Sequence, residues 1–316
     1  MALAIGVDIG GTKVAAGVVA DDGSILEVVR SPTPDTEAPA VSEAVVDLVE
    51  QLRARHPAVE TVGIGAAGWI DRSRSFVYFA PNVVWREEPI RDDLAARIDL
   101  PIVVENDGNA TAWAEHRFGA GRGSPDLICV TIGTGIGGGM VASGKLYRGG
   151  FGIAAEFGHM QLVPDGHRCG CGRRGCWEQY CSGKALVREA REIASTDAIH
   201  GRRMLQLAGG EADDITGPVV TRAAQEGDPA AIEAFTTIGE WLGRGLANVT
   251  AALDPGLFVI GGGVSDAGDL LLGPGREWFR RRLPGRGFRP EAELVRAVLG
   301  PEAGLVGAAD LSRQAG

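Results

Sequence analysis

The chain has 316 residues, enough for about two domains, because a single hydrophobic core rarely grows beyond ~250–300 residues. Its 45% hydrophobic and 23% charged residues are typical of a folded globular protein, which excludes a disordered chain and an integral membrane protein. Its 31 basic and 41 acidic residues give a net charge of −10, which repels a phosphate backbone, so nucleic acid is not an expected partner.

The N-terminal segment and the apolar runs of the chain predict the cellular location of the protein. The segment from Met1 to Asp8 has no basic region of the kind that opens a signal peptide. No apolar run approaches the ~18–20 residues that span a bilayer. We therefore expect a cytoplasmic protein with no membrane partner, whose five cysteines are thiols or metal ligands rather than disulfides.

Strands and helices alternate in the first part of the chain. Short β-type runs joined by Gly-rich or Asp-Gly turns predict an antiparallel meander at 3–8, 14–20 and 25–29. Helical spacing of apolar residues predicts a helix over 41–52. Further strands are expected at 61–66 and 101–104. This alternation predicts an α/β fold with at least some parallel pairing.

The second half of the chain repeats the opening pattern. A strand at 127–132, a Gly-Thr-Gly turn and a returning strand at 138–143 resemble the first hairpin, which suggests two related lobes. Helices are then expected around 184–194 and 229–252, a strand at 257–260, and a short closing helix from Gly304.

Three Gly-rich loops are candidates for binding a nucleotide. The first follows Asp8 and contains Gly10, Gly11, Thr12 and Lys13, whose N–H, hydroxyl and ammonium groups suit a phosphate. An ordinary tight hairpin is the alternative. A loop of the same character contains Gly133, Thr134 and Gly135, and one such turn in each lobe favours phosphate binding. In the third, Gly262 and Gly263 follow a strand, where adenosine could lie against bare backbone; the spacing is not that of a dinucleotide loop.

A polar pair follows the strand at 101–104. Asn106 and Asp107 lie at the carboxyl end of this strand, where α/β sheets usually bind ligands. An amide and a carboxylate suit the hydroxyls of a polyol, and Asp107 could accept the proton of an attacking hydroxyl. The alternative is a turn in which the Asp caps a helix over 109–118.

The most specific pattern is one His and three Cys within eighteen residues, namely His159, Cys169, Cys171 and Cys176. This set matches a four-coordinate structural zinc site, and the glycines between the cysteines give the tight turns that bring thiolates together. A redox pair is the alternative, but the spacing is Cys-x-Cys and a fourth ligand is available. Cys129 and Cys181 are expected to be small buried hydrophobic residues.

The order of these motifs, ending in the segment Gly304 to Ala309, resembles the superfamily of actin, sugar kinases and Hsp70 ATPases over the whole chain. The resemblance implies two actin-like lobes with ribonuclease-H-like motifs on either side of an active-site cleft. It also implies that Asp8 holds Mg²⁺ through water, that Thr12 and Thr134 face the β- and γ-phosphates, and that the third loop borders adenosine. We expect a small lobe of residues 1–107 and about 298–316, and a large lobe of 108–297 with the zinc site.

Within that superfamily, the zinc motif together with the Asn106–Asp107 pair closely resembles the ROK-family sugar kinases and, over the full length, the bacterial glucokinases of that family. The resemblance implies that Asn106 and Asp107 bind the 4- and 6-hydroxyls of the sugar. Toward the 1-, 2- and 3-hydroxyls it implies Glu156, His159 and Glu178, with Gly68 and Asn82 as weaker candidates.

The activity implied is transfer of the γ-phosphate of ATP to O6 of glucose, with catalytic Mg²⁺ and structural Zn²⁺, in a homodimer or homotetramer. Kinases of the same family for N-acetylglucosamine, N-acetylmannosamine or fructose would share nearly every motif. A non-catalytic sugar sensor would be expected to lack Asp107. An actin-like filament or chaperone ATPase would have no use for the zinc cluster.

Overall fold

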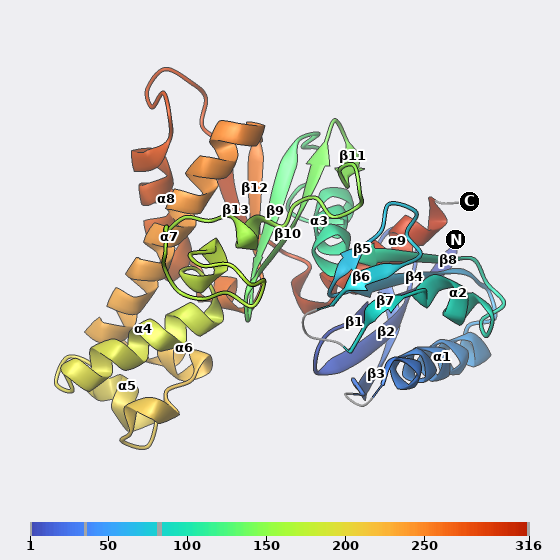
Figure 1. The fold of residues 1–316 in the computed structure, drawn as a ribbon, viewed down its shortest axis with the longest axis horizontal. Helices are drawn as coiled ribbons and strands as arrows, with labels where there is room; N and C mark the ends of the chain where they lie inside the picture. The colour runs from blue at the N-terminus through green and yellow to red at the C-terminus, as the bar shows by residue number, and fades with distance from the viewer. Residues whose placement is uncertain (1, 35–36, 81–83, 315–316) are drawn as a thin grey trace. The chain divides into compact units, whose positions relative to one another are not determined.

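The computed structural model describes residues 2–34, 37–80 and 84–314 (Figure 1). The chain forms two compact units. The first unit comprises Met1–Cys129, Gly138–Glu156 and Ala297–Gly316, and the second comprises Val130–Gly137 and Phe157–Arg296. The C-terminal segment belongs to the first unit, in which α3 (Asp107–Phe118) packs against α9 (Ala303–Arg313). The expected lobes of 1–107 with about 298–316 and of 108–297 stay a prediction.

The first unit contains a five-stranded sheet in the order β3-β2-β1-β4-β8. Antiparallel pairing joins β1, β2 and β3, and parallel pairing joins β1 to β4 and β4 to β8. The strands are β1 (Leu3–Ile9), β2 (Lys13–Val19), β3 (Ile25–Pro32), β4 (Val59–Ala66) and β8 (Ile102–Asn106). In the register of these strands Ile9 is the partner of Ala66, and Ala66 is the partner of Asn106. The carboxyl ends of the three parallel strands therefore meet at one edge of the sheet.

Helices cover both faces of this sheet. The apolar stripe of α1 (Ala38–Arg55) packs with the odd-numbered side chains of β1, such as Ile5 and Val7, in one core cluster. On the other face α9 approaches the backbone of β1 and β4 directly. A Cβ atom on Gly6 would lie 1.9 Å from the carbonyl oxygen of Leu305. Glycine is required there because no side chain fits between strand and helix.

A small antiparallel sheet completes the first unit. It consists of β5 (Trp69–Ile70), β6 (Val77–Phe79) and β7 (Arg86–Glu88), and α2 (Ile90–Ala95) follows it. These short elements were not expected from the sequence, because two or three residues are too few to show a periodic pattern.

A second five-stranded sheet has the order β11-β10-β9-β12-β13. Its strands are β9 (Leu127–Ile132), β10 (Ile136–Ala142), β11 (Lys145–Tyr147), β12 (Leu257–Gly261) and β13 (Glu293–Arg296). β10 pairs antiparallel with β11, and β12 pairs in parallel with β13. β9 and β10 are neighbours in this sheet and are separated only by residues 133–135, so the hairpin that the sequence predicts around residue 134 is present.

Helices make up most of the second unit. They are α4 (Gly183–Thr196), α5 (Arg202–Leu207), α6 (Gly217–Gln225), α7 (Pro229–Leu253) and α8 (Asp269–Arg282). The sequence predicts α4 and α7 but not α8, which contains Pro274 between two glycines, a pattern that normally interrupts helices. These small residues let α8 lie directly against α7, since a Cβ atom on Gly243 would be 2.6 Å from the carbonyl oxygen of Gly275. Among the described helices, none is both long and apolar enough to cross a membrane.

Candidate functional site

The first Gly-rich loop is a closed turn between β1 and β2. The Gly10 N–H donates to the carbonyl of Lys13 at 3.0 Å. Thr33 bonds to the carbonyl oxygens of Gly10 and Thr12, at 2.7 and 3.2 Å. Gly11, Thr12 and Lys13 are exposed. The carbonyls of this turn are thus satisfied within the chain, while its exposed side offers donors to an anion.

Asp8 precedes this loop and carries a perturbed carboxyl group. Burial, followed by repulsion from Asp107, raises the pKa of Asp8 to about 7, although Lys13 acts in the opposite direction. Asp8 Oδ1 also lies close to α9, at 3.4 Å from the position that a Cβ atom on Gly304 would have. A partly buried carboxylate with a carboxylate neighbour favours a bound cation, which restores the ionised form of both groups. The donor chemistry of Asp8 therefore fits Mg²⁺.

We expect Asp8→Asn to stabilise the metal-free protein at neutral and alkaline pH. A pKa raised to about 7 from the ordinary value of 3.8 means that the unfolded chain ionises first, so wild-type stability falls as pH rises between these values and stays lower above pH 7. The amide that replaces the carboxyl group does not ionise, so the variant does not lose stability in this way as the pH rises. Its melting temperature in EDTA should exceed that of the wild type by several degrees at pH 8 and match it below pH 4. Equal melting temperatures at both pH values would contradict the raised pKa.

Asn106 is the N-cap of α3 and holds the residues around it. Its Oδ1 accepts from the N–H of Asn109 at 3.0 Å, and its Nδ2 donates to the carbonyl oxygen of Gly68 at 3.0 Å and to Asp107 Oδ1 at 3.1 Å. The helix cap that the sequence offered as an alternative is therefore present, but the capping side chain is the amide of Asn106 and not the carboxylate of Asp107. The structure brings Gly68, Asn106 and Asp107 together.

Asp107 is the first residue of α3. Its Oδ1 accepts from the N–H of Gly108 at 2.9 Å and from Asn106, which leaves Oδ2 to meet a hydroxyl. Burial raises the pKa of Asp107 above its ordinary value, against the lowering effect of these hydrogen bonds. A raised pKa makes the carboxylate a better proton acceptor. The position at a helix N-terminus also favours the ionised form that acceptance requires.

The other expected sugar ligands are divided between the units. Glu156 is half-buried and ends the 138–156 segment of the first unit, whereas His159 and Glu178 belong to the second. Asn82 lies outside the described residues. Sugar binding by these residues stays a prediction.

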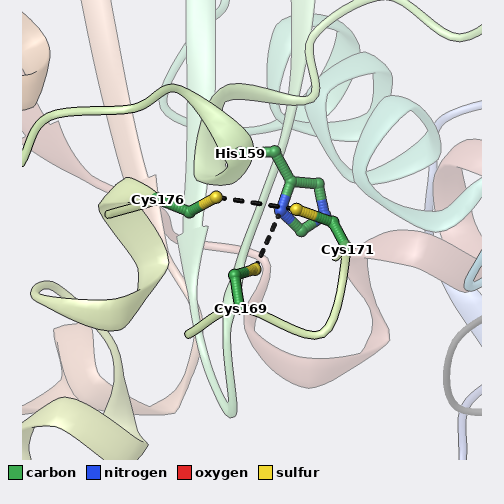
Figure 2. A group of neighbouring side chains, drawn as sticks. All are labelled: His159, Cys169, Cys171 and Cys176. Carbon is green, nitrogen blue, oxygen red and sulfur yellow. Dashed lines mark hydrogen bonds between the residues drawn. The ribbon is translucent and has the colours of Figure 1, made fainter. Parts of the chain in front are cut away.

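The predicted metal cluster is formed in the second unit. One ligand atom from each of His159, Cys169, Cys171 and Cys176 lies within 4.8 Å of the others (Figure 2). Cys169 Sγ is 3.6 Å from His159 Nδ1, and Cys171 Sγ is 3.6 Å from Cys176 Sγ. Neighbouring ligands of a tetrahedral zinc ion lie about this far apart, since zinc–ligand bonds are ~2.0–2.3 Å. The side chains therefore fit Zn²⁺.

Tight backbone turns build this cluster. Gly172 and Gly175 have φ values of 90° and 75°, and the Cys169 N–H donates to the carbonyl oxygen of Arg173 at 2.9 Å. A Cβ atom on Gly175 would lie 1.6 Å from the carbonyl oxygen of Val163, so only glycine fits. The glycines between the cysteines have the role that the sequence suggests.

Cys129 and Cys181 lie outside the cluster and are fully buried. Burial raises the pKa of both thiols, which disfavours the thiolate that binds metal. This confirms the expectation that both are core residues.

Glu178 links the cluster to the second Gly-rich loop. Cys169 Sγ lies 3.0 Å from Glu178 Oε1 and donates a hydrogen bond to it as a thiol, whereas a zinc-bound thiolate would have no proton to donate. The other carboxylate oxygen, Oε2, lies 2.4 Å from the position of a Cβ atom on Gly135. The loop is further held by the Gly183 N–H, which donates to the carbonyl oxygen of Gly133 at 2.8 Å. A change at the metal cluster can therefore reach the loop through one side chain.

The third Gly-rich loop contains two glycines with different roles. Gly262 has φ of 81°, and its Cβ atom would be 2.5 Å from the carbonyl oxygen of Ile132, so the fold itself requires glycine. No heavy atom lies within 4 Å of a Cβ position on Gly263. Gly263 is therefore the position at which a side chain tests nucleotide binding without disturbing the fold.

We expect Gly263→Val to raise KM for ATP about tenfold or more while KM for glucose stays within about twofold, because the new side chain projects from the loop assigned to adenosine. Steady-state kinetics with each substrate varied in turn would measure this. Gly273→Ala, at another glycine with open space around it, serves as a control. Equal increases in both KM values would show that the loop is structural.

The profile of the ROK family matches residues 4–315. The chain belongs to the ROK family. This match confirms the resemblance that the Gly-rich loops, the Asn106–Asp107 pair and the Cys₃His cluster indicated.

Curated relatives of this chain differ in how similar their sequences are to it. A glucokinase from Streptomyces coelicolor is 51% identical over 314 residues, which cover 99% of this chain and 98% of the relative. An N-acetylmannosamine kinase from Escherichia coli O157:H7 is 33% identical over 98% of both chains. The chain is thus markedly more similar to the glucokinase.

A solved structure of a ROK family glucokinase from Streptomyces griseus, in complex with glucose and AMPPNP, has a TM-score of 0.91 with this chain. The two are 52% identical, and the match covers 99% of each. This agreement confirms the predicted fold class of an actin-like ATPase.

Proposed function

We propose that this chain phosphorylates D-glucose at O6 with ATP, giving glucose 6-phosphate and ADP. The observation that carries the proposal is the 51–52% identity, over nearly the whole length, to glucokinases, one of them solved with glucose and an ATP analogue. The geometry of Asp107 supports it, because a half-buried carboxylate with one oxygen held by hydrogen bonds and the other available is suited to a hydroxyl group.

Asp107 acts in this proposal as the general base. Asp107 Oδ2 accepts the proton of the 6-hydroxyl of glucose while the oxygen of that hydroxyl attacks the γ-phosphorus of ATP. The raised pKa of Asp107, caused by burial, strengthens this oxygen as a base. Asn106 holds Oδ1 and so fixes the direction in which Oδ2 points.

The Gly-rich loops and Asp8 serve the nucleotide. Thr12, Lys13 and Thr134 donate to the β- and γ-phosphates, and Gly263 borders adenosine. Mg²⁺ held by Asp8, directly or through water, would neutralise charge on the transferring group. Zn²⁺ held by the Cys₃His cluster is structural, because all four protein ligands that a closed site needs are present.

Sugar selectivity is tested by ADP release in a coupled assay across glucose, mannose, fructose, N-acetylglucosamine and N-acetylmannosamine. We expect kcat/KM to be highest for glucose. A higher value for N-acetylmannosamine would favour the activity of the 33% identical relative. Turnover on none of these sugars would favour a sugar sensor. The predicted homodimer or homotetramer rests on the sequence resemblance alone.

A further inference from the structure

A buried carboxylate stands directly before the Asn106–Asp107 pair. Glu105, on β8, is 0% exposed, and both of its oxygens are occupied. Oε1 accepts from the Asn106 N–H at 2.9 Å and from Asn109 Nδ2 at 3.0 Å. These two donors belong to the turn that presents Asp107. One oxygen of Glu105 therefore fixes the backbone and side chains on either side of the proposed base.

The other oxygen of Glu105 pairs with two arginines from distant segments. Oε2 accepts a hydrogen bond from Arg74 Nε at 3.0 Å. It also forms an ion pair with Arg148 Nε at 2.7 Å, in a contact that is not aligned as a hydrogen bond. Arg74 comes from the β5–β6 turn, and its carbonyl oxygen accepts from the Val104 N–H at 3.4 Å. Arg148 comes from the segment after β11. One buried charge therefore joins three parts of the first unit.

Arg148 also forms hydrogen bonds to the turn between β5 and β6. Its two terminal nitrogens donate to the carbonyl oxygens of Asp71 and Arg72, at 3.0 and 2.9 Å. A few residues later Gly152, with φ of 96°, lies so close to the same turn that a Cβ atom would be 2.5 Å from the carbonyl oxygen of Ile70. The segment that ends at Glu156 is thus fastened to the β5–β6 turn, and through Arg148 to Glu105.

A second buried carboxylate in the same unit gives a comparison. Glu115, on α3, is also 0% exposed, but it accepts only backbone N–H groups, from Ala120, Val298 and Leu299. It fastens the C-terminal part of α3 to the C-terminal segment, about two helical turns from Asp107. Burying a charged carboxylate costs free energy in both cases. Of the two, only Glu105 contacts residues beside the proposed base.

We propose that Glu105 is a positioning residue for phosphoryl transfer. Its charge sets the Asn106–Asp107 turn and, through Arg148, the segment 148–156 in one fixed arrangement. This inference rests on the proposed glucose phosphorylation for its kinetic consequence. The fastening of the two segments by Glu105 is a property of the structure that can be measured without any substrate.

The test uses Glu105→Gln, which keeps the shape of the side chain. The amide oxygen can still accept from Asn106 and Asn109, but its NH₂ faces two guanidinium groups that have no acceptor. We expect KM for glucose to rise about tenfold and kcat to fall about tenfold, with KM for ATP within about twofold. Glu115→Gln, the matched control, should leave all three constants within about twofold even where it lowers the melting temperature.

Arg148→Met and the double variant show whether Arg148 acts through Glu105. Because removing one partner strands the other, each single variant should be impaired, while the double variant should be no worse than the worse single one. Amide hydrogen exchange without substrate should rise at least tenfold in segments 69–76 and 148–154 of Glu105→Gln. In Glu115→Gln the rise should instead appear around 298–299.

Unchanged exchange in both segments, or glucose and ATP constants that change in equal proportion, would overturn the proposal and make Glu105 a fold residue like Glu115. A wild-type protein inactive on glucose would contradict the proposed function. In that case the exchange experiment would still decide whether Glu105 fastens the two segments.

Discussion

Asp107→Asn is expected to lower kcat for glucose by about 10²–10⁴-fold, the range that general-base catalysis contributes, while glucose still binds within a few-fold of the wild-type affinity. The amide can keep its hydrogen bonds to Gly108 and Asn106 through one oxygen, but it cannot accept a proton. Single-turnover kinetics with calorimetric glucose binding would separate the two effects.

The same base predicts a pH dependence. Only ionised Asp107 accepts a proton, and burial raises its pKa, so the acidic limb of kcat/KM should lie above the pH at which an ordinary Asp titrates. Asp99→Asn, the same change at an exposed position of the first unit, should leave kcat and the limb unchanged. Near-normal kcat in Asp107→Asn would place the base elsewhere, with Asp8 the next candidate.

Loss of the metal is expected to have the second largest effect. Cys171→Ser should abolish stoichiometric zinc and raise KM for glucose tenfold or more, because the family resemblance assigns His159 and Glu178 to the sugar. KM for ATP should rise by a smaller factor, through Glu178 and the Gly135 loop that it touches. The first unit should stay folded, because its core shares no residue with the cluster.

Metal analysis of the purified protein comes first in this experiment. Cys181→Ala, at a buried cysteine outside the cluster, should retain zinc and both KM values. A wild-type protein without zinc would remove the basis for the site. Zinc loss without a change in KM for glucose would show that the metal only stabilises the loop and that His159 and Glu178 do not bind sugar.

Local features of the fold could be read from the sequence because they are written in neighbouring residues. Strand β1 is a short, nearly continuous apolar run, and helix α1 shows the periodic apolar pattern of a half-buried helix. The Cys₃His cluster could be read because all four ligands and their turn-forming glycines lie within eighteen residues. Helix α8 could not, because Pro274 and its glycines signal a turn locally, and only packing against α7 makes a helix favourable.

The sequence by itself determined the fold class and the residues of the Cys₃His cluster, and it singled out the Gly-rich loops and Asp107 as candidates for phosphate binding and for the base, since each of these depends on a short stretch of chain. Tertiary structure alone decided which residues surround them. Glu105 is an ordinary strand residue in sequence, and only folding brings Arg74 and Arg148, which lie 31 and 43 positions away, to the same oxygen. Gly6 and Gly63 likewise resemble any strand glycine until α9 packs against their backbone. Contacts between distant segments leave no periodic signal in the chain, so their physical role appears only when the segments meet.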